Sequence, residues 1–212
     1  MRDLPDEHDN FYGIRVNDRV YVDKSIYVKK LLNHRCKFFR MCRPRRFGKS
    51  NFLQMLNSYF SGDQKLFDGL AIADRVFQSY PVLYFDFSSM NADTKEDFEA
   101  DLSHKIHEMA KSYEISITKN ETLPIQLEQL IHELSLKEVH NDSVVILIDE
   151  YDRPIRRYAE CNQAENVELM NYITQNFLQI FEDCIENIKF LFMTCTTQLL
   201  SLIHISEPTR PY

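Results

Sequence analysis

The chain has 212 residues, of which 44% are hydrophobic and 27% are charged, as is typical of one soluble globular domain. Its formal net charge of −7 gives no reason to expect electrostatic binding of nucleic acid or acidic membranes. The N-terminus is unlike a secretory signal, and no apolar run approaches the roughly 20 residues that span a bilayer. We therefore expect a cytoplasmic protein without a membrane partner.

Short β-rich runs alternate with longer helical patterns along the chain, which is typical of βαβ units and a mostly parallel sheet. The first predicted strand is 37–42, KFFRMC. A helical pattern follows from Lys49 to about Tyr59, and Gly62 ends it. The second predicted strand is 82–87, VLYFDF, so the first half of the chain forms one strand–helix–strand unit.

The second half of the chain continues this alternation. Residues 94–97 form a capping box that begins a helix, and another helix is predicted at about 124–136. The third predicted strand, VVILI at 144–148, is a continuous apolar run of the kind found in central strands covered on both faces. A long helix at about 165–184 precedes a fourth strand at 189–194.

The last segment, LSLIHISEPTRPY from residue 200, does not continue the pattern. Residues 200–210 resemble, letter for letter, the translation of a transposase adapter used in sequencing libraries, and a natural strand and turn is the alternative. We therefore expect residues 1–199 to form the domain and residues 200–212 to be a non-native tail. The natural protein is then expected to be longer than this fragment.

Between the first predicted strand and its helix lies RPRRFGKS, residues 43–50. A phosphate-binding loop reads G-x-x-x-x-G-K-[ST] at such a position, and Gly48, Lys49 and Ser50 fill its last three places. Arg43 stands where the first glycine would be. Gly48 lets the backbone approach phosphate, Lys49 can reach the β- and γ-phosphates, and the Ser50 hydroxyl can bind Mg²⁺. The alternative is a basic turn on a solvated surface.

Residues 40–49 carry five cationic side chains and no acid, in a chain that is acidic as a whole. Phosphate is the natural partner of such a local positive field. The predicted nucleotide-binding residues are Arg43, Pro44, Arg45, Arg46, Phe47, Gly48, Lys49, Ser50 and Asn51.

The third strand ends in the acidic pair Asp149 and Glu150. Both carboxylates should lie at the carboxyl edge of the sheet, where ligands bind in open α/β folds. Asp149 would hold Mg²⁺ together with Ser50, and Glu150 would polarise the attacking water as a general base. The alternative is a strand followed by an acidic turn.

The two motifs support each other because each ends a predicted strand, in the expected order and about a hundred residues apart. Thr194, at the end of the fourth strand, is a candidate sensor of the γ-phosphate, with an ordinary strand-end threonine as the alternative. The candidate catalytic residues are thus Glu150, Lys49 and Thr194, the candidate metal ligands are Ser50 and Asp149, and the expected cofactors are ATP and Mg²⁺.

These segments resemble the AAA-ATPase-like domain family, whose pattern combines YVDK, RPRRFGK[ST] and a strand ending in IDEYD. The matching segments are YVDKSIYVKKLL from Tyr21, RPRRFGKS from Arg43, YPVLYFDF from Tyr80 and ILIDEYDRPI from Ile146. The resemblance covers roughly residues 11–199 and accounts for Arg43, since the family carries arginine there. It implies ATP binding and hydrolysis by the matched residues.

Family members often carry a C-terminal nuclease-like domain of the PD-(D/E)XK type, which this sequence lacks. A nucleic-acid partner is therefore expected only through a missing C-terminal region. Near the fourth strand, family members commonly read T-G-I-T-R. Here Cys195 stands in place of that glycine and Gln198 in place of that arginine.

The sequence thus predicts an α/β fold, a three-layer P-loop NTPase sheet that is mostly parallel and truncated after its fourth core strand. The fourth strand should lie beside the strand before the loop, whose other side is left as an exposed apolar edge that lowers solubility or stability. The expected function is Mg-dependent ATP hydrolysis coupled to conformational change. The rivals are an ATP-gated switch without significant turnover, and the regulatory ATPase part of a nucleic-acid-processing protein.

Overall fold

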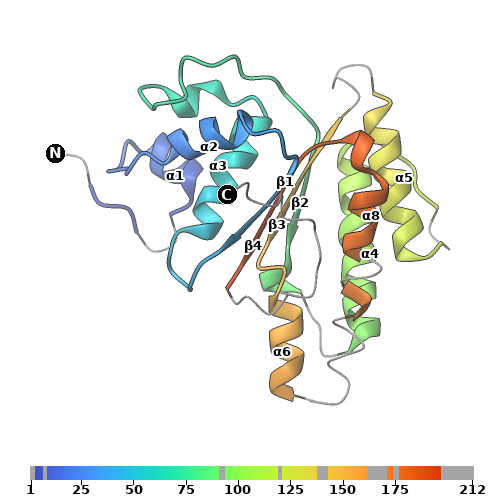
Figure 1. The fold of residues 1–212 in the computed structure, drawn as a ribbon. Coiled ribbons are helices and arrows are strands. Elements are labelled where there is room, and N and C mark those ends of the chain that lie inside the picture. Colours follow the sequence, from blue (N-terminus) through green and yellow to red (C-terminus); the bar gives the residue numbers. More distant parts are fainter. Residues whose placement is uncertain are drawn as a thin grey trace, which may run out of the picture.

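The computed structural model describes residues 3–6, 9–90, 94–118, 121–137, 143–161, 171–173 and 177–196, without the side chains of 158–161. A four-stranded sheet lies at the centre, with helices on both faces (Figure 1). In chain order the elements are α1 (Phe11–Val16), α2 (Ser25–Leu32), β1 (Phe38–Cys42), α3 (Lys49–Phe60), η1 (Gln64–Phe67), β2 (Val82–Asp86), η2 (Phe87–Ser89), α4 (Lys95–Ser112), α5 (Leu123–Ser135), β3 (Val144–Asp149), α6 (Arg153–Cys161), α8 (Leu178–Asp183), η5 (Ile185–Asn187) and β4 (Ile188–Cys195).

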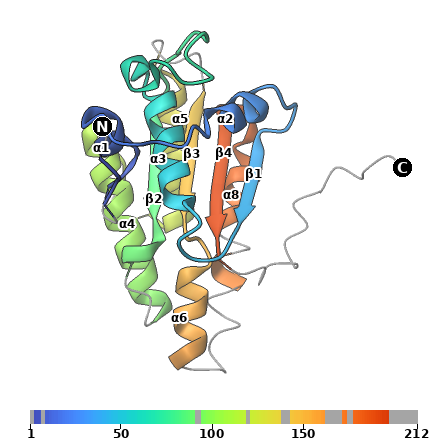
Figure 2. The same cartoon turned by 90° about the vertical axis from the view of Figure 1, so that its left-hand side faces the viewer.

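All strand pairs in this sheet are parallel, and the strand order is β1-β4-β3-β2. β4 therefore lies beside β1, as the sequence predicts. In the register, Met41 is opposite Thr194 and Asp86 is opposite Asp149. The carboxyl ends of the strands consequently meet at one edge, where α6 begins (Figure 2). The predicted α/β three-layer parallel fold is confirmed.

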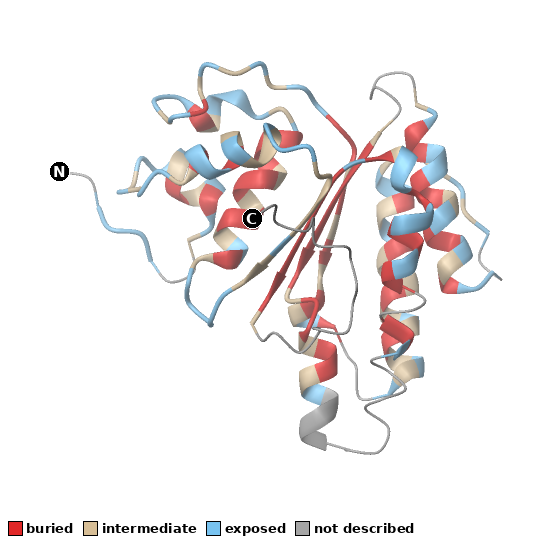
Figure 3. Cartoon of the chain, in the orientation of Figure 1, coloured by how far each residue is buried: buried red, intermediate tan, exposed pale blue. Residues whose placement is uncertain are grey.

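Alternation along β3 explains why its first five residues, Val144 to Ile148, are all apolar. Val144, Ile146 and Ile148 face the core formed with α4, α5 and α8, whereas Val145 and Leu147 face the core formed with α1, α2 and α3. All six residues of the strand are buried (Figure 3). Because successive side chains of a strand point to opposite faces, a strand covered on both sides has no polar side to show.

The helices bury one stripe each, at the spacing that the sequence predicts. In α4, Phe98, Leu102 and Ile106 are buried, and the Thr94 side chain caps the helix by accepting the Asp97 N–H at 3.0 Å. α3 ends before Gly62, whose φ of +84° suits the left-handed position after a helix. Among the described helices, none has the length and apolar character needed to cross a membrane.

The structure adds three helices that the sequence patterns did not predict. These are α1, α2 and α6. α1 and α2 have only six and eight residues, too short for a clear period, and they are held by the buried side chains of Phe11 and Val28. The predicted helix at 165–184 is confirmed at its C-terminal part by α8, and residues 162–170 and 174–176 lie outside the described residues.

Cys195, at the end of β4, gives a test of the packing at this strand end. It is fully buried, and burial first, with the neighbouring Cys42 thiol second, raises its pKa to about 12. At pH 8 only about one thiol in ten thousand is then ionised, and the thiolate is the reactive form. We expect iodoacetamide to modify Cys195 of the native protein at least about a hundredfold more slowly than the half-buried Cys36.

Mass spectrometry of the alkylated peptides measures both rates. The same reaction in urea is the control, because the two cysteines should then react at similar rates. Equal rates in the native protein would show that the end of β4 is open to solvent.

Candidate functional site

The turn between β1 and α3 is exposed, and its last residue is shaped for a close backbone approach. Gly48 is the N-cap of α3 with a φ of +72°, where a β-carbon would be strained. No side chain caps this end of the 12-residue helix, so the N–H groups of its first turn face outward. The Arg43 N–H donates to the Cys195 carbonyl at 3.1 Å and fixes the start of the turn to the end of β4.

Lys49 is the one residue of the predicted loop that is buried, with 5% of its surface exposed. Its ammonium donates to the Pro44 carbonyl at 3.2 Å, across the turn that it follows in sequence. The side chain therefore lies on the inner side of the loop and carries its charge to the loop's own backbone. A phosphate entering this turn would meet the ammonium and the helix N-terminus together.

Asp149 and Glu150 follow the buried strand β3, and Thr194 holds both of them. The Thr194 hydroxyl donates to Asp149 Oδ1 and accepts the Glu150 N–H at 3.0 Å. The Thr194 carbonyl accepts the Tyr151 N–H at 3.0 Å. Thr194 is fully buried and Asp149 is 4% exposed, so these bonds replace the solvent that the carboxylate has lost.

The loop and the acidic pair face one cavity of about 330 Å³. The residues that line it are Arg45, Arg46, Gly48, Lys49, Ser50, Asn51, Glu150 and Arg153. Asp149 lies one residue from this lining, on the buried side. Two segments about a hundred residues apart in the chain are thus brought to the same place, as the sequence predicts. Positive charge predominates around the cavity, with one carboxylate opposite the loop.

Two residues of this cavity have a backbone conformation that is unfavourable for their type. Arg46 has a φ of +65° and Glu150 a φ of +49°. Non-glycine residues in the left-handed region cost about 1–3 kcal/mol each, and such residues gather at functional sites. Two further described residues with positive φ, Asp18 and Glu114, follow the ends of α1 and α4, where the left-handed conformation is ordinary. Strain at both halves of one cavity supports a functional role for it.

Two arginines that the sequence motifs did not indicate lie beside the acidic turn. Arg153 and Arg156 on α6 each place a guanidinium nitrogen 3.6 Å from Glu150 Oε2. Arg156 also bonds the buried Asp152 at 2.9 Å, and Asp152 accepts the Thr196 N–H. The signal in the sequence is Pro154, which fits the first turn of a helix and places the arginines on α6. The sequence patterns predicted no helix directly after the acidic pair, where α6 begins at Arg153.

The remaining predicted residues have different positions. Arg43 and Phe47 line a separate cavity beside α2, and Pro44 is exposed. Thr194 is not among the described residues that line the 330 Å³ cavity, and its single donor is used on Asp149. Its role as a phosphate sensor stays a prediction, while its contacts define a positioning role. Gln198 lies outside the described residues.

The oxygen atoms at this edge fit Mg²⁺ bound together with phosphates. Within the described part of the chain, no group of three or more His, Cys, Asp or Glu side chains is suited to hold a metal ion alone. Mg²⁺ is bound in such sites through one or two protein oxygens, with phosphates and water completing the shell. The Ser50 hydroxyl, exposed at the cavity, and the Asp149 carboxylate are oxygen ligands of the kind required.

A parallel sheet with a glycine-bearing loop after β1 and carboxylates after β3 defines the class of P-loop NTPase-like domains. The family model described as "Predicted AAA-ATPase" matches residues 7–202. The chain therefore belongs to this AAA-ATPase-like family, and the membership supports an ATP-binding or ATPase-like function. The resemblance noted in the sequence is thus confirmed.

A relative in Azotobacter chroococcum mcd 1, described as "Uncharacterized protein in vnfD 5'region", is 33% identical over 141 residues. The alignment covers 66% of this chain and 27% of the relative, so the chain spans about a quarter of the length of the protein that it matches. No solved structure matches this chain. The nuclease-like C-terminal domain that the resemblance implies stays a prediction.

Proposed function

We propose that the chain binds Mg-ATP at the cavity between the loop and the acidic pair, and hydrolyses it. The observation that carries the proposal is that Lys49, Ser50 and Glu150 line one cavity. A phosphate chain on the loop would have the cations on one side and a carboxylate on the other. Phosphoryl transfer needs this arrangement, since its catalysis consists mostly of positioning and of charge stabilisation.

Each residue of the site has a proposed role that follows from the chemistry of its side chain. Lys49 and the N–H groups at the start of α3 bind the β- and γ-phosphates. Ser50 and Asp149 hold Mg²⁺, which neutralises charge that develops on the phosphate oxygens. Thr194 acts as a positioning residue, because it keeps the Asp149 carboxylate and the Glu150 backbone in fixed places.

Glu150 is the candidate general base for the attacking water. Its side chain is 15% exposed, and the buried Oε2 has no hydrogen-bond partner among the described residues. A buried carboxylate oxygen that lacks a donor can accept the proton of a bound water molecule. The two arginines at 3.6 Å attract the carboxylate without hydrogen-bonding to it. Movement of Glu150 between the arginines and water would couple turnover to a change in the position of α6.

A nucleotide-gated switch without significant turnover is the second candidate. The same ion pairs favour it, because attraction by Arg153 and Arg156 holds the carboxylate toward α6. ATP would then be bound and retained, and its presence would be signalled through α6.

Steady-state phosphate release by Glu150→Gln tests both candidates. We expect the variant to bind ATP with unchanged affinity and to release phosphate at least about a hundredfold more slowly than the wild type, since a general base contributes 10²- to 10⁴-fold. Glu186→Gln, which changes an exposed carboxyl group, is the matched control and should release phosphate at the wild-type rate. If the wild type binds ATP but is as slow as Glu150→Gln, the switch is correct and hydrolysis is not.

A further inference from the structure

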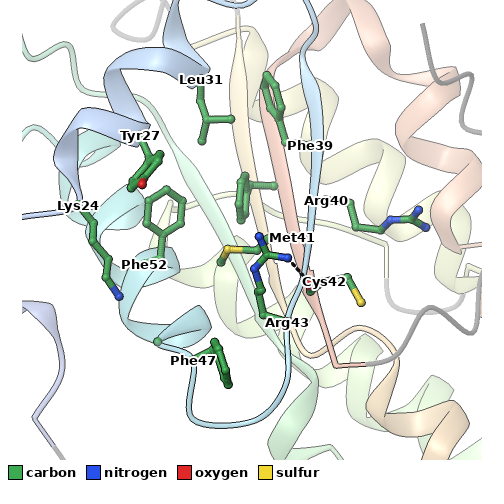
Figure 4. Close-up of a pocket in the computed structure, with 12 residues that line it drawn as sticks. Lys24, Tyr27, Leu31, Phe39, Arg40, Met41, Cys42, Arg43, Phe47 and Phe52 are labelled. Carbon is green, nitrogen blue, oxygen red and sulfur yellow. Dashed lines mark hydrogen bonds between the residues drawn. The ribbon is translucent and has the colours of Figure 1, made fainter. Parts of the chain in front are cut away.

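A second cavity, of about 490 Å³, opens beside the loop (Figure 4). It is formed by α2, by the side chains of β1 that face α2, and by the first turn of α3. Gly48 lines both this cavity and the one that contains Glu150. The two spaces therefore meet at the backbone of the residue that begins α3, where the phosphates of the proposed nucleotide would bind.

The lining of the second cavity is aromatic and apolar. Leu31 and the buried Phe52 form part of its wall, while Tyr27 and Phe47 are 55% and 63% exposed. In Figure 4 the Tyr27 and Phe52 rings lie next to each other on one side of β1. Exposed aromatic rings above an apolar wall suit a flat, uncharged aromatic ligand, because stacking buries both faces of the ligand.

Lys24 and Arg43 line this cavity with their cationic side chains, whereas two β1 side chains point away from it. Arg40 and Cys42 point to the opposite side of β1 in Figure 4, and Arg40 hydrogen-bonds to Tyr151 there. Lys24 Nζ lies 3.0 Å from the point that a β-carbon on Gly48 would occupy. Its ammonium is thus at the junction of the two cavities, where it can donate to a phosphate or sugar oxygen.

A third cavity, of about 590 Å³, lies between the N-terminal segment and the loop. It is the alternative site for the flat aromatic part of the ligand. Asp6 and Asp9 line it together with Gln54. Carboxylates next to the loop would repel the phosphates, and the described residues that line this space include no aromatic ring. The chemistry of the second cavity therefore suits a nucleobase better.

We propose that the cavity lined by Tyr27 and Lys24 binds the base of the nucleotide whose phosphates lie on the loop. The inference rests on the proposed function, because the loop must first hold the phosphates. Tyr27 stacks on the base, Leu31 and Phe52 exclude water from its edge, and Lys24 binds where the sugar joins the phosphates. Contacts with the base then contribute to the affinity for ATP. Inorganic tripolyphosphate has no base, so its affinity lacks this contribution.

Calorimetric titration with Mg-ATP and with Mg-tripolyphosphate tests this assignment. We expect Tyr27→Ala to weaken ATP binding by about tenfold and to leave tripolyphosphate binding unchanged, as expected for the loss of one stacking contact. Tyr27→Phe keeps the ring and should bind ATP like the wild type. The exposed position of Tyr27 favours correct folding of both variants, which a thermal melt checks.

Gln54→Ala, in the third cavity, is the matched control and should bind ATP like the wild type. The proposal fails if Gln54→Ala selectively weakens ATP, or if Tyr27→Ala affects both ligands equally or neither. It also fails if the wild type binds tripolyphosphate as tightly as ATP. That result would contradict the base site but not the proposed phosphate site. A folded wild type that binds neither ligand would refute the proposed function itself, and this inference with it.

Discussion

Lys49→Ala is expected to lower the affinity for Mg-ATP by a hundredfold or more. The ammonium lies inside the loop and would donate charge-assisted hydrogen bonds to two phosphates. Hydrogen bonds to charged groups contribute about 1.5–3 kcal/mol each, so two such bonds correspond to roughly a hundredfold or more in affinity. Titration with a fluorescent ATP analogue measures the change.

The fold should tolerate this substitution. Within the described part of the chain, the Lys49 ammonium donates one hydrogen bond, to the Pro44 carbonyl, and the loss of this bond costs about 1 kcal/mol. Removing one cation from an arginine-rich turn also lowers repulsion within the turn. Lys65→Ala, on η1, is the matched control, because this exposed lysine lines none of the three cavities. Wild-type affinity in folded Lys49→Ala would refute the phosphate site.

Thr194→Val is expected to destabilise the protein by about 3 kcal/mol. The shapes of the two side chains match, but valine leaves the buried Asp149 carboxylate and the Glu150 N–H without their partner. Buried groups that lose a partner cost about 1–3 kcal/mol, and more when charged. For a domain of this size the melting temperature should fall by roughly 10 °C. Urea unfolding gives the free energy directly.

Thr194→Ser separates the hydroxyl group from the methyl group. Serine keeps both hydrogen bonds and loses one methyl group, so we expect a loss of only about 1 kcal/mol. If valine and serine destabilise the protein equally, the hydroxyl is not what holds the acidic turn. Phosphate release by both variants then shows whether Thr194 also affects turnover, which would be expected of a residue that positions Glu150.

Much of the sheet could be predicted because its signals are local. The apolar run at 144–148 needs no partner to indicate a strand covered on both faces, and β3 is buried throughout. The order of β1 and β4 followed from the P-loop class rather than from any single residue. The short helices α1 and α2 were missed, since their stability comes from burying Phe11 and Val28 in the core that they share with α3 more than from their own sequences.

The sequence predicted the loop and the acidic pair separately, but not the contacts that connect them. The sequence places Lys49 and Glu150 each at the end of a strand, and the cavity that they share follows from the parallel sheet. Thr194 meets Asp149 because β4 lies between β1 and β3, which spacing along one chain does not reveal. The arginines of α6 were missed for a similar reason: their contacts depend on where the helix starts.

The last residues of β4 are bonded to both halves of the site. Cys195 accepts from Arg43 at the start of the loop, Thr194 binds the acidic pair, and Thr196 donates to Asp152. A push or pull on this strand end would shift the loop and the carboxylates in the same direction, and would keep their spacing. The end of β4 therefore connects the loop and the acidic turn mechanically. A force applied to the chain near residue 196 would act on both sides of the cavity at once.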